Sequence, residues 1–202
     1  MTPPSARFRS SRLAGMAGTA WAYEMAETLL AGPLPRRWAH SQGVAARARA
    51  LAPLFGDEAE LLEAAAILHD IGYAPELAST GFHPLDGGRY LHARPEADDR
   101  ITRLVAHHSF AALEAEERGL RPALEAEFPL LENPQLVEAL VCCDMTTTPD
   151  GLPTSSRERI AEIRSRYGDD SIVGRFIRRA EPHIHEAVDR THERATAAGI
   201  RL

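Results

Sequence analysis

The sequence predicts an all-α fold, and three observations support this fold class. Apolar residues recur at helical spacing, alternating strand-like runs are essentially absent, and glycine or proline residues separate the segments. A chain of 202 residues can form one compact domain that buries about 70% of its unfolded surface. We expect a disordered tail at 1–18 and a single domain at 19–202, with the helices of 155–202 packed on it.

Start and stop signals place the first three helices. These helices are expected at about 19–30, 35–54 and 57–70. Thr19 and Asp57 are candidate N-caps, because their side chains can accept a hydrogen bond from the free N–H groups of a first turn. Pro35 is tolerated in a first turn, and Gly56 and Gly72 provide the stops after the second and third helices.

Six further helices are expected in the rest of the chain. They are placed at about 84–93, 97–108, 111–118, 136–145, 155–167 and 172–198. The segments 73–82 and 146–153 are rich in helix breakers and are expected to be loops. Gly168 should end the helix at 155–167, and Pro182 should kink or split the last helix.

The composition argues against several classes of protein. A net charge of −6 is unusual for a general nucleic-acid binder, which normally has a basic balance. No apolar run approaches the roughly 20 residues needed to span a bilayer, and the N-terminus lacks the apolar core of a signal peptide. The only cysteines, Cys142 and Cys143, are neighbours, so we expect them to pack in the core without a disulfide, in a cytoplasmic protein.

Four residues that can ligate a metal occur in apolar helical surroundings. His69 and Asp70 are adjacent at the end of an apolar run, and His40 is spaced to lie on or beside the buried face of its helix. Asp144 ends another apolar helix, where an unpaired buried carboxylate would be costly. Imidazole nitrogens and carboxylate oxygens bind divalent transition metals, so these residues are better explained together than separately.

The order His…His-Asp…Asp resembles the HD-domain superfamily of metal-dependent phosphohydrolases. His40, His69-Asp70 and Asp144 match the superfamily motif, and the stretch 65–72 is similar to its usual signature. The resemblance implies a compact HD-domain helical bundle in which these four residues hold one metal ion.

Three more histidines resemble ligands of bacterial HD proteins of the binuclear type. His83 begins a His-Pro-x-x-Gly element, and His107-His108 stands where such proteins carry a fifth imidazole or a histidine pair. The resemblance implies that Asp70 bridges two ions, with His83 and one or both of the pair holding the second ion. It favours His108, because Ser109 follows it as in the HD hydrolases of diadenosine tetraphosphate, although His107 stays a candidate.

Two departures separate the chain from particular subfamilies. Ser109-Phe110 follows the histidine pair where HD-GYP proteins carry a different motif, so cleavage of a cyclic dinucleotide is not expected. Many binuclear members have a lysine shortly after His-Asp, and this chain has Tyr73 at that position. The phosphate contact made by that lysine is therefore not assigned to Tyr73.

The chemistry expected of this site is attack by a metal-bound hydroxide, with Asp70 as the central catalytic residue. A divalent ion lowers the pKa of its bound water to about 7. The candidate cofactors are one or two ions of Fe, Mn, Co, Ni or Zn, because mixed imidazole and carboxylate ligands discriminate poorly among these metals.

Cationic side chains are needed to contact the substrate phosphate. Arg36 lies one helical turn before His40, so it is the first candidate. The weaker candidates are Arg37, Arg89 and Arg103. His107 could protonate the leaving group if it is not a metal ligand.

The sequence thus predicts a hydrolase of phosphoester or phosphoanhydride bonds in a nucleotide or other small phosphometabolite. Two alternatives stay open: a mixed-valence di-iron oxygenase, which also occurs on the HD fold, and a non-catalytic metal or nucleotide sensor. The expected partner is a small phosphorylated substrate, with no nucleic acid, no membrane, and a homodimer as the default. The remaining histidines are expected at the surface: His92, His183, His185 and His192.

Overall fold

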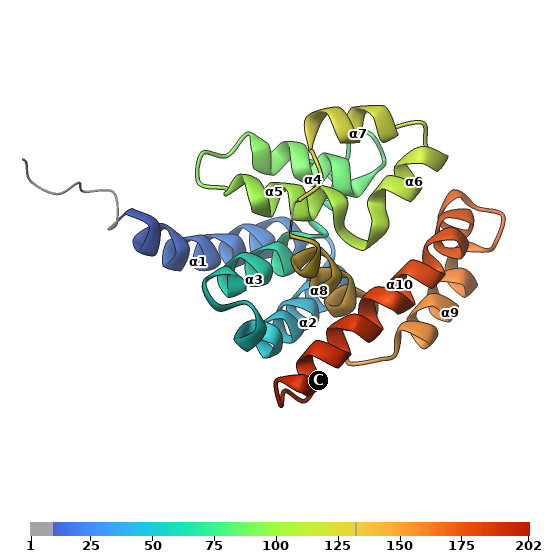
Figure 1. Ribbon diagram of the computed structural model, residues 1–202. Coiled ribbons are helices and arrows are strands. Elements are labelled where there is room, and N and C mark those ends of the chain that lie inside the picture. The colour runs from blue at the N-terminus through green and yellow to red at the C-terminus, as the bar shows by residue number, and fades with distance from the viewer. Residues whose placement is uncertain (1–9, 132) are drawn as a thin grey trace, which may run out of the picture.

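Helix α8 lies near the centre of the bundle, where it packs against α2, α3, α5, α9 and α10 (Figure 1). The computed structural model describes residues 10–131 and 133–202, so positions 1–9 of the predicted tail lie outside the described part. The α-helices are α1 (Ser10–Leu30), α2 (Pro35–Leu51), α3 (Ala59–Leu68), α4 (His83–His92), α5 (Asp99–His107), α6 (Ala111–Glu117), α7 (Arg121–Glu127), α8 (Pro134–Met145), α9 (Ser156–Tyr167) and α10 (Ile172–Ala197). Short 3-10 turns are η1 (Ala52–Leu54), η2 (Gly56–Glu58), η3 (Ile71–Tyr73) and η4 (His108–Phe110).

The prediction of an all-α fold is confirmed. Within the described ranges no strand occurs, and the only β-pairing is an isolated bridge between Thr147 and Pro153. None of the helices in these ranges is long and apolar enough to cross a membrane.

Several predicted helix ends are wrong. The first helix begins at Ser10 and not at Thr19, and the added turns contain alanine, leucine and methionine, which favour helix. Asp57 does not cap α3, because it lies inside η2 and the helix starts without a side-chain cap. α3 ends at Leu68, which leaves His69 and Asp70 in the turn that follows.

Two differences concern whole elements. The short helix α7 was not predicted, since its only buried residue is Leu124 and it gives little apolar periodicity. Pro182 does not split α10, which runs unbroken past it. The apolar face of α10, including Phe176 and Ile184, packs in a buried cluster with α8 and α9, and this packing offsets the hydrogen bond that the proline cannot make.

The core consists of three apolar clusters, and α8 contributes to two of them. Leu136, Leu140 and Cys143 on one face of α8 belong to the cluster of α1, α2, α3 and α5. Val141, Cys142 and Met145 on the other face pack with α9 and α10. The third cluster lies among α4 to α7. The two cysteines are therefore buried and unpaired, as predicted, and Asp144 follows them between the two faces of α8.

Candidate metal centre

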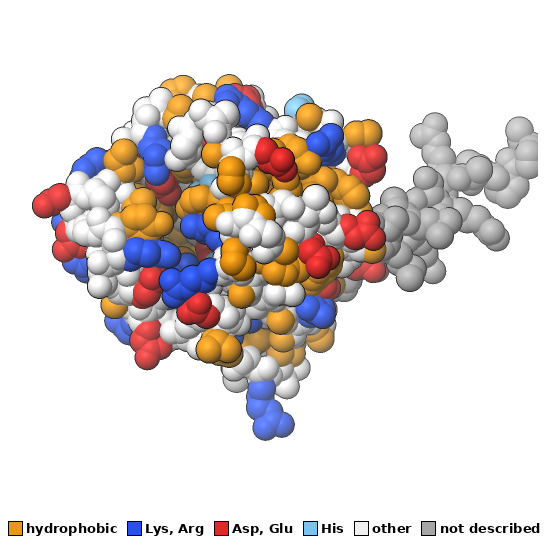
Figure 2. All heavy atoms as spheres, turned by 180° about the vertical axis from the view of Figure 1, so that it is seen from behind, with side chains coloured by type: hydrophobic (Ala, Val, Ile, Leu, Met, Phe, Trp, Pro, Cys, Tyr) orange, Lys and Arg blue, Asp and Glu red, His pale blue; other side chains and the backbone are white. Residues whose placement is uncertain are grey.

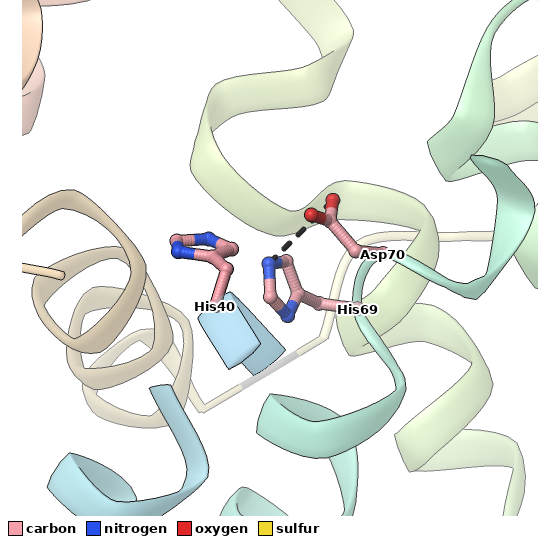
Figure 3. Close-up of side chains that lie close together, drawn as sticks. All are labelled: His40, His69 and Asp70. Atoms are coloured by element: carbon pink, nitrogen blue, oxygen red, sulfur yellow. Dashed lines mark ion pairs between the residues drawn. The ribbon is translucent and has the colours of Figure 1, made fainter. Parts of the chain in front are cut away.

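Three side chains from two segments meet in the interior beside α8. His40 comes from the middle of α2, while His69 and Asp70 come from the turn after α3. Figure 3 shows the three side chains pointing toward one another, and each offers a ligand atom within 4.8 Å of the others. His69 Nε2 lies 3.5 Å from Asp70 Oδ1, and all three residues are buried.

Backbone carbonyl oxygens orient three imidazole rings of the site. His40 Nδ1 lies 2.9 Å from the oxygen of Thr148, and His69 Nδ1 lies 2.7 Å from the oxygen of Ala66. His108 Nδ1 lies 2.6 Å from the oxygen of Val105. A carbonyl can only accept, so each Nδ1 must carry the proton, and Nε2 is left as the nitrogen available to a metal.

Asp144 approaches the same histidines from the end of α8. Its Oδ1 lies 3.0 Å from His40 Nε2 and 3.9 Å from His69 Nε2. The hydroxyl of Ser109 donates a hydrogen bond to the other carboxylate oxygen. Asp144 thus stands where it could complete a set of two imidazoles and two carboxylates with His40, His69 and Asp70.

A second set of possible ligands shares Asp70 with the first. Asp70, His83 and His108 also offer ligand atoms within 4.8 Å of one another. His83 Nε2 lies 3.4 Å from Asp70 Oδ1 and 3.0 Å from His108 Nε2. Because one carboxylate belongs to both sets, the arrangement could hold two ions with Asp70 between them.

Gly72 allows the second set to form. This residue lies in η3, directly against the start of α4, where His83 is the first residue. A Cβ atom on Gly72 would lie 2.0 Å from the carbonyl oxygen of His83. Only glycine permits this approach, which brings His83 to Asp70.

Electrostatics hold most of these groups in the ligating state. Burial lowers the pKa of His69 to about 4 and also lowers the pKa of His83, so both rings are neutral at pH 7. Burial alone would raise the pKa of the Asp70 carboxyl, but the positive charge of Arg37 outweighs it and holds that pKa well below its usual range. Neutral imidazoles beside ionised carboxylates are the protonation states that a divalent metal requires.

His40 and Asp144 form the one strongly coupled pair in the site. Burial alone would lower the pKa of His40, but the hydrogen bond and negative charge of Asp144 outweigh it and raise that pKa. Burial likewise opposes ionisation of Asp144, yet the hydrogen bond from His40 keeps the pKa of its carboxyl low. His40 therefore holds a proton more tightly than a free imidazole does, and it would have to be deprotonated to act as a ligand.

The donor set fits a divalent transition metal. His69 Nε2 is buried, and no hydrogen-bond partner for it occurs among the described residues. Leaving a buried nitrogen unpaired costs about 1–3 kcal/mol, which a metal–ligand bond would offset. Together with two buried carboxylates, this nitrogen supplies the mixed nitrogen and oxygen ligands typical of such ions.

Arg37 lies over the site in a stack of three side chains. Its Nη1 donates to Asp70 Oδ2 at 2.5 Å, and its guanidinium lies 3.2 Å from the ring centre of Tyr73. Tyr73 in turn stacks on His83, with ring centres 3.9 Å apart. The tyrosine found where many binuclear members carry lysine therefore positions both an arginine and a possible ligand.

The structure does not bring two predicted catalytic residues to the cluster. Arg36 is paired with Asp150 at the surface, where 62% of its side chain is exposed. His107 is buried, but its Nε2 lies 2.5 Å from the carbonyl oxygen of Phe128, on α5 away from the cluster. Arg37, a weaker candidate for the phosphate contact, and His108, the favoured member of the histidine pair, both line the hollow beside the cluster.

The other predicted arginines and histidines are also remote from the cluster. Arg89 pairs with Glu127, and Arg103 pairs with Asp99. His92 and His183 are exposed as predicted, whereas His185 and His192 on α10 are partly buried. A hydrogen-bond contact of 2.9 Å joins His185 Nδ1 to Ser156 Oγ at the start of α9, which accounts for the position of that ring.

The cluster opens into a hollow whose lining the sequence did not predict in detail. Its walls include five of the ligand candidates, and also Glu114 of α6 and Arg159 and Arg166 of α9. The five are His40, Asp70, His83, His108 and Asp144, whereas His69 does not line the hollow. No sequence signal could have linked α9 to the site, because this contact depends on how α9 packs on α8 and α10. A second hollow adjoins the first and shares Arg37, Arg159 and Arg166 with it.

Comparison of the sequence with known proteins gives one family match and one partial match to a relative. The sequence model of the HD domain matches residues 37–145, just over half of the chain. Ribonuclease Y from Rubrobacter xylanophilus is 37% identical over 70 residues, which make up 35% of this chain and 14% of that protein. The match therefore covers only a small part of the relative's length. No solved structure matches the chain.

Proposed function

The chain belongs to the HD domain family, and on this premise we propose that it hydrolyses a phosphoester or phosphoanhydride bond in a small phosphorylated molecule, such as a nucleotide. The observation that carries the proposal is the sharing of Asp70 by two sets of possible metal ligands. Two ions held on either side of one carboxylate suit displacement at phosphorus.

We assign one ion to His40, His69, Asp70 and Asp144, and the other to Asp70, His83 and His108. When bound, divalent ions lower the pKa of water and polarise phosphoryl oxygens. The chain's own contribution is to fix the ligands. Backbone carbonyls of Thr148, Ala66 and Val105 orient the three imidazole rings by hydrogen bonds to their Nδ1 atoms. The hydroxyl of Ser109 holds the Asp144 carboxylate.

Arg37 is the side chain we propose for contact with the substrate phosphate. A guanidinium has five N–H donors, and one of those of Arg37 is used by Asp70. The stack on Tyr73 holds the planar group in place at the wall of both hollows. Its remaining donors can therefore bind phosphoryl oxygens and stabilise the charge that develops on them.

The test is hydrolysis by protein loaded separately with Mn, Fe, Co, Ni or Zn. The panel contains p-nitrophenyl phosphate, nucleoside mono-, di- and triphosphates, dinucleoside polyphosphates and a short RNA. We expect turnover of at least one small substrate and none by Asp70→Asn. If no metal form cleaves any member of the panel under air or under nitrogen, the proposal is refuted.

Two neighbouring variants test the choice of arginine. Arg37→Gln should lower kcat by about a hundredfold to a thousandfold, because removing one preorganised donor to a transition-state oxyanion costs about that much. Arg36→Gln should have a smaller effect, since Arg36 is paired with Asp150 at the surface. Metal content is measured in both variants. An equal or larger loss in Arg36→Gln would return the role to Arg36.

A further inference from the structure

One face of α9 forms a wall of the hollow beside the metal centre. The residues of this face that line the hollow are Arg159, Ile163, Arg166 and Tyr167. Successive members are four, three and one positions apart, which places all of them on one side of the helix. A capping box at Ser155 fixes the start of this helix. α9 lies outside residues 37–145, so the family match assigns no role to these side chains.

Arg159 is buried with part of its hydrogen-bonding capacity unused. The residue is only 8% exposed, and its Nη1 donates to Glu162. Within the described part of the chain, its buried Nε–H has no acceptor. A buried guanidinium is costly unless its donors are bonded, so the pair with Glu162 alone does not account for its position.

Glu162 joins Arg159 to Arg166, which lies two turns after Arg159 along α9. One oxygen of Glu162 accepts from Arg159, and the other lies 3.4 Å from Nε of Arg166. Two positive charges thus share one carboxylate, and the group keeps a net positive charge at the wall. An incoming anion would gain both guanidinium groups and would compete with Glu162 for them.

We propose that Arg159 and Arg166 form a second anion subsite beside the metal centre, which selects substrates carrying a further phosphate or similar anionic group next to the scissile phosphate. The inference rests on the proposed hydrolysis at the metals. Both arginines also border the second hollow, whose other walls include Leu34 and Pro149. Arginine side chains gather beside a hollow near the middle of the face shown in Figure 2, and no lysine occurs in this sequence.

Binding of two non-hydrolysable probes tests the subsite. Methylenediphosphonate carries two phosphonate groups and methylphosphonate carries one, and calorimetry compares their affinities for the protein as purified. In Arg166→Gln and Arg159→Gln the diphosphonate should bind about tenfold more weakly, with methylphosphonate unchanged. In Glu162→Gln it should bind more tightly, because the competing carboxylate charge is removed. Arg164→Gln is the matched control, since Arg164 lies on α9 but pairs with Asp169 and borders neither hollow.

The outcomes separate this inference from the proposed function. Arg166 and Glu162 are partly exposed, so their variants decide the result even if Arg159→Gln does not fold. If the ratio of the two affinities is the same in all variants, the subsite does not exist, whether or not the protein hydrolyses phosphoesters. If two equivalents of methylphosphonate bind and Arg166→Gln loses one, the arginines hold a free anion and the substrate assignment fails. If no substrate is hydrolysed but the ratio changes as expected, the anion subsite exists, and the proposed function fails together with the substrate assignment that rests on it.

Discussion

Replacing Gly72 by alanine should remove one of the two proposed ion sites and spare the other. Gly72 lies where η3 meets the start of α4. An added Cβ would lie 2.0 Å from the carbonyl oxygen of His83 and 2.6 Å from the nitrogen of Gly87. Both atoms belong to the backbone, so no side-chain rotation can relieve the clash, and α4 itself must move.

The size of this movement follows from contact distances. Non-bonded heavy atoms attract at separations of about 3.5–4.0 Å, so α4 must shift by on the order of 1 Å to relieve the clash. Metal–ligand distances tolerate deviations of only about 0.2 Å. His83 should therefore leave its set, while His40 and Asp144 lie on other helices and keep theirs. Overpacking of this kind costs about 1–3 kcal/mol of stability.

Metal content per chain, measured by mass spectrometry with thermal unfolding alongside, checks this prediction. Gly72→Ala should hold one ion fewer than the unmodified protein and should unfold at a lower temperature. Gly32→Ala is the matched control, because a Cβ there meets nothing within 4 Å. A folded Gly72→Ala variant that binds the full complement of ions with unchanged affinity would refute this role of Gly72.

Three further predictions concern single groups of the site. Asp70→Asn should abolish turnover and lower the metal content, because this carboxylate belongs to both sets, and an unchanged metal content would contradict its role as a ligand. Metal affinity should fall as the pH is lowered from about 8 to about 6, because ligand imidazoles must be deprotonated. Burial would lower the pKa of His40, but the hydrogen bond and charge of Asp144 outweigh burial and raise this pKa above its ordinary value of 6.5. Protons therefore compete with the metal for this ring at higher pH than they would for a free imidazole. Titration against a chromophoric chelator measures this dependence, and an affinity that is constant over that range would contradict it. His107→Ala should keep its metal content and lose about 1–3 kcal/mol of stability, because the Phe128 carbonyl loses its partner, whereas loss of metal would make His107 a ligand.

The sequence was a better guide to the residues that come together in the cluster than to the residues that line the hollow. His40, His69, Asp70 and Asp144 come together as the motif order predicted. The sequence could not decide between Arg36 and Arg37 as the arginine nearest the cluster, because positions three and four residues before His40 share its helix face equally well. Tertiary partners decide the choice, since Asp150 binds one arginine and Asp70 binds the other.

Local backbone geometry explains the histidine pair. His107 ends α5, and the chain then passes through Ser109 and Phe110, which both have positive φ. The helical conformation ends at His108, which lines the hollow, whereas His107 lies beside the carbonyl of Phe128. Positive φ at these residue types is rare, so no sequence rule predicts such a turn.

Most helices were predictable because their apolar spacing and breakers are local signals. The boundaries around Asp57 and Pro182 were not, since packing overrides local preference there. The sequence also could not predict that α9 lines the hollow, because this position depends on contacts between α9 and helices such as α8. Chain-specific features of the site, including Arg159, therefore emerge only from the structure.

The central claim is that Asp70 lies between two ions. The most direct test is the metal content of the protein purified without chelators and then titrated with Mn or Zn under calorimetry. We predict saturation at two ions per chain and coupled loss of both in Asp70→Asn. Saturation at one ion, or the absence of any binding, would contradict this account.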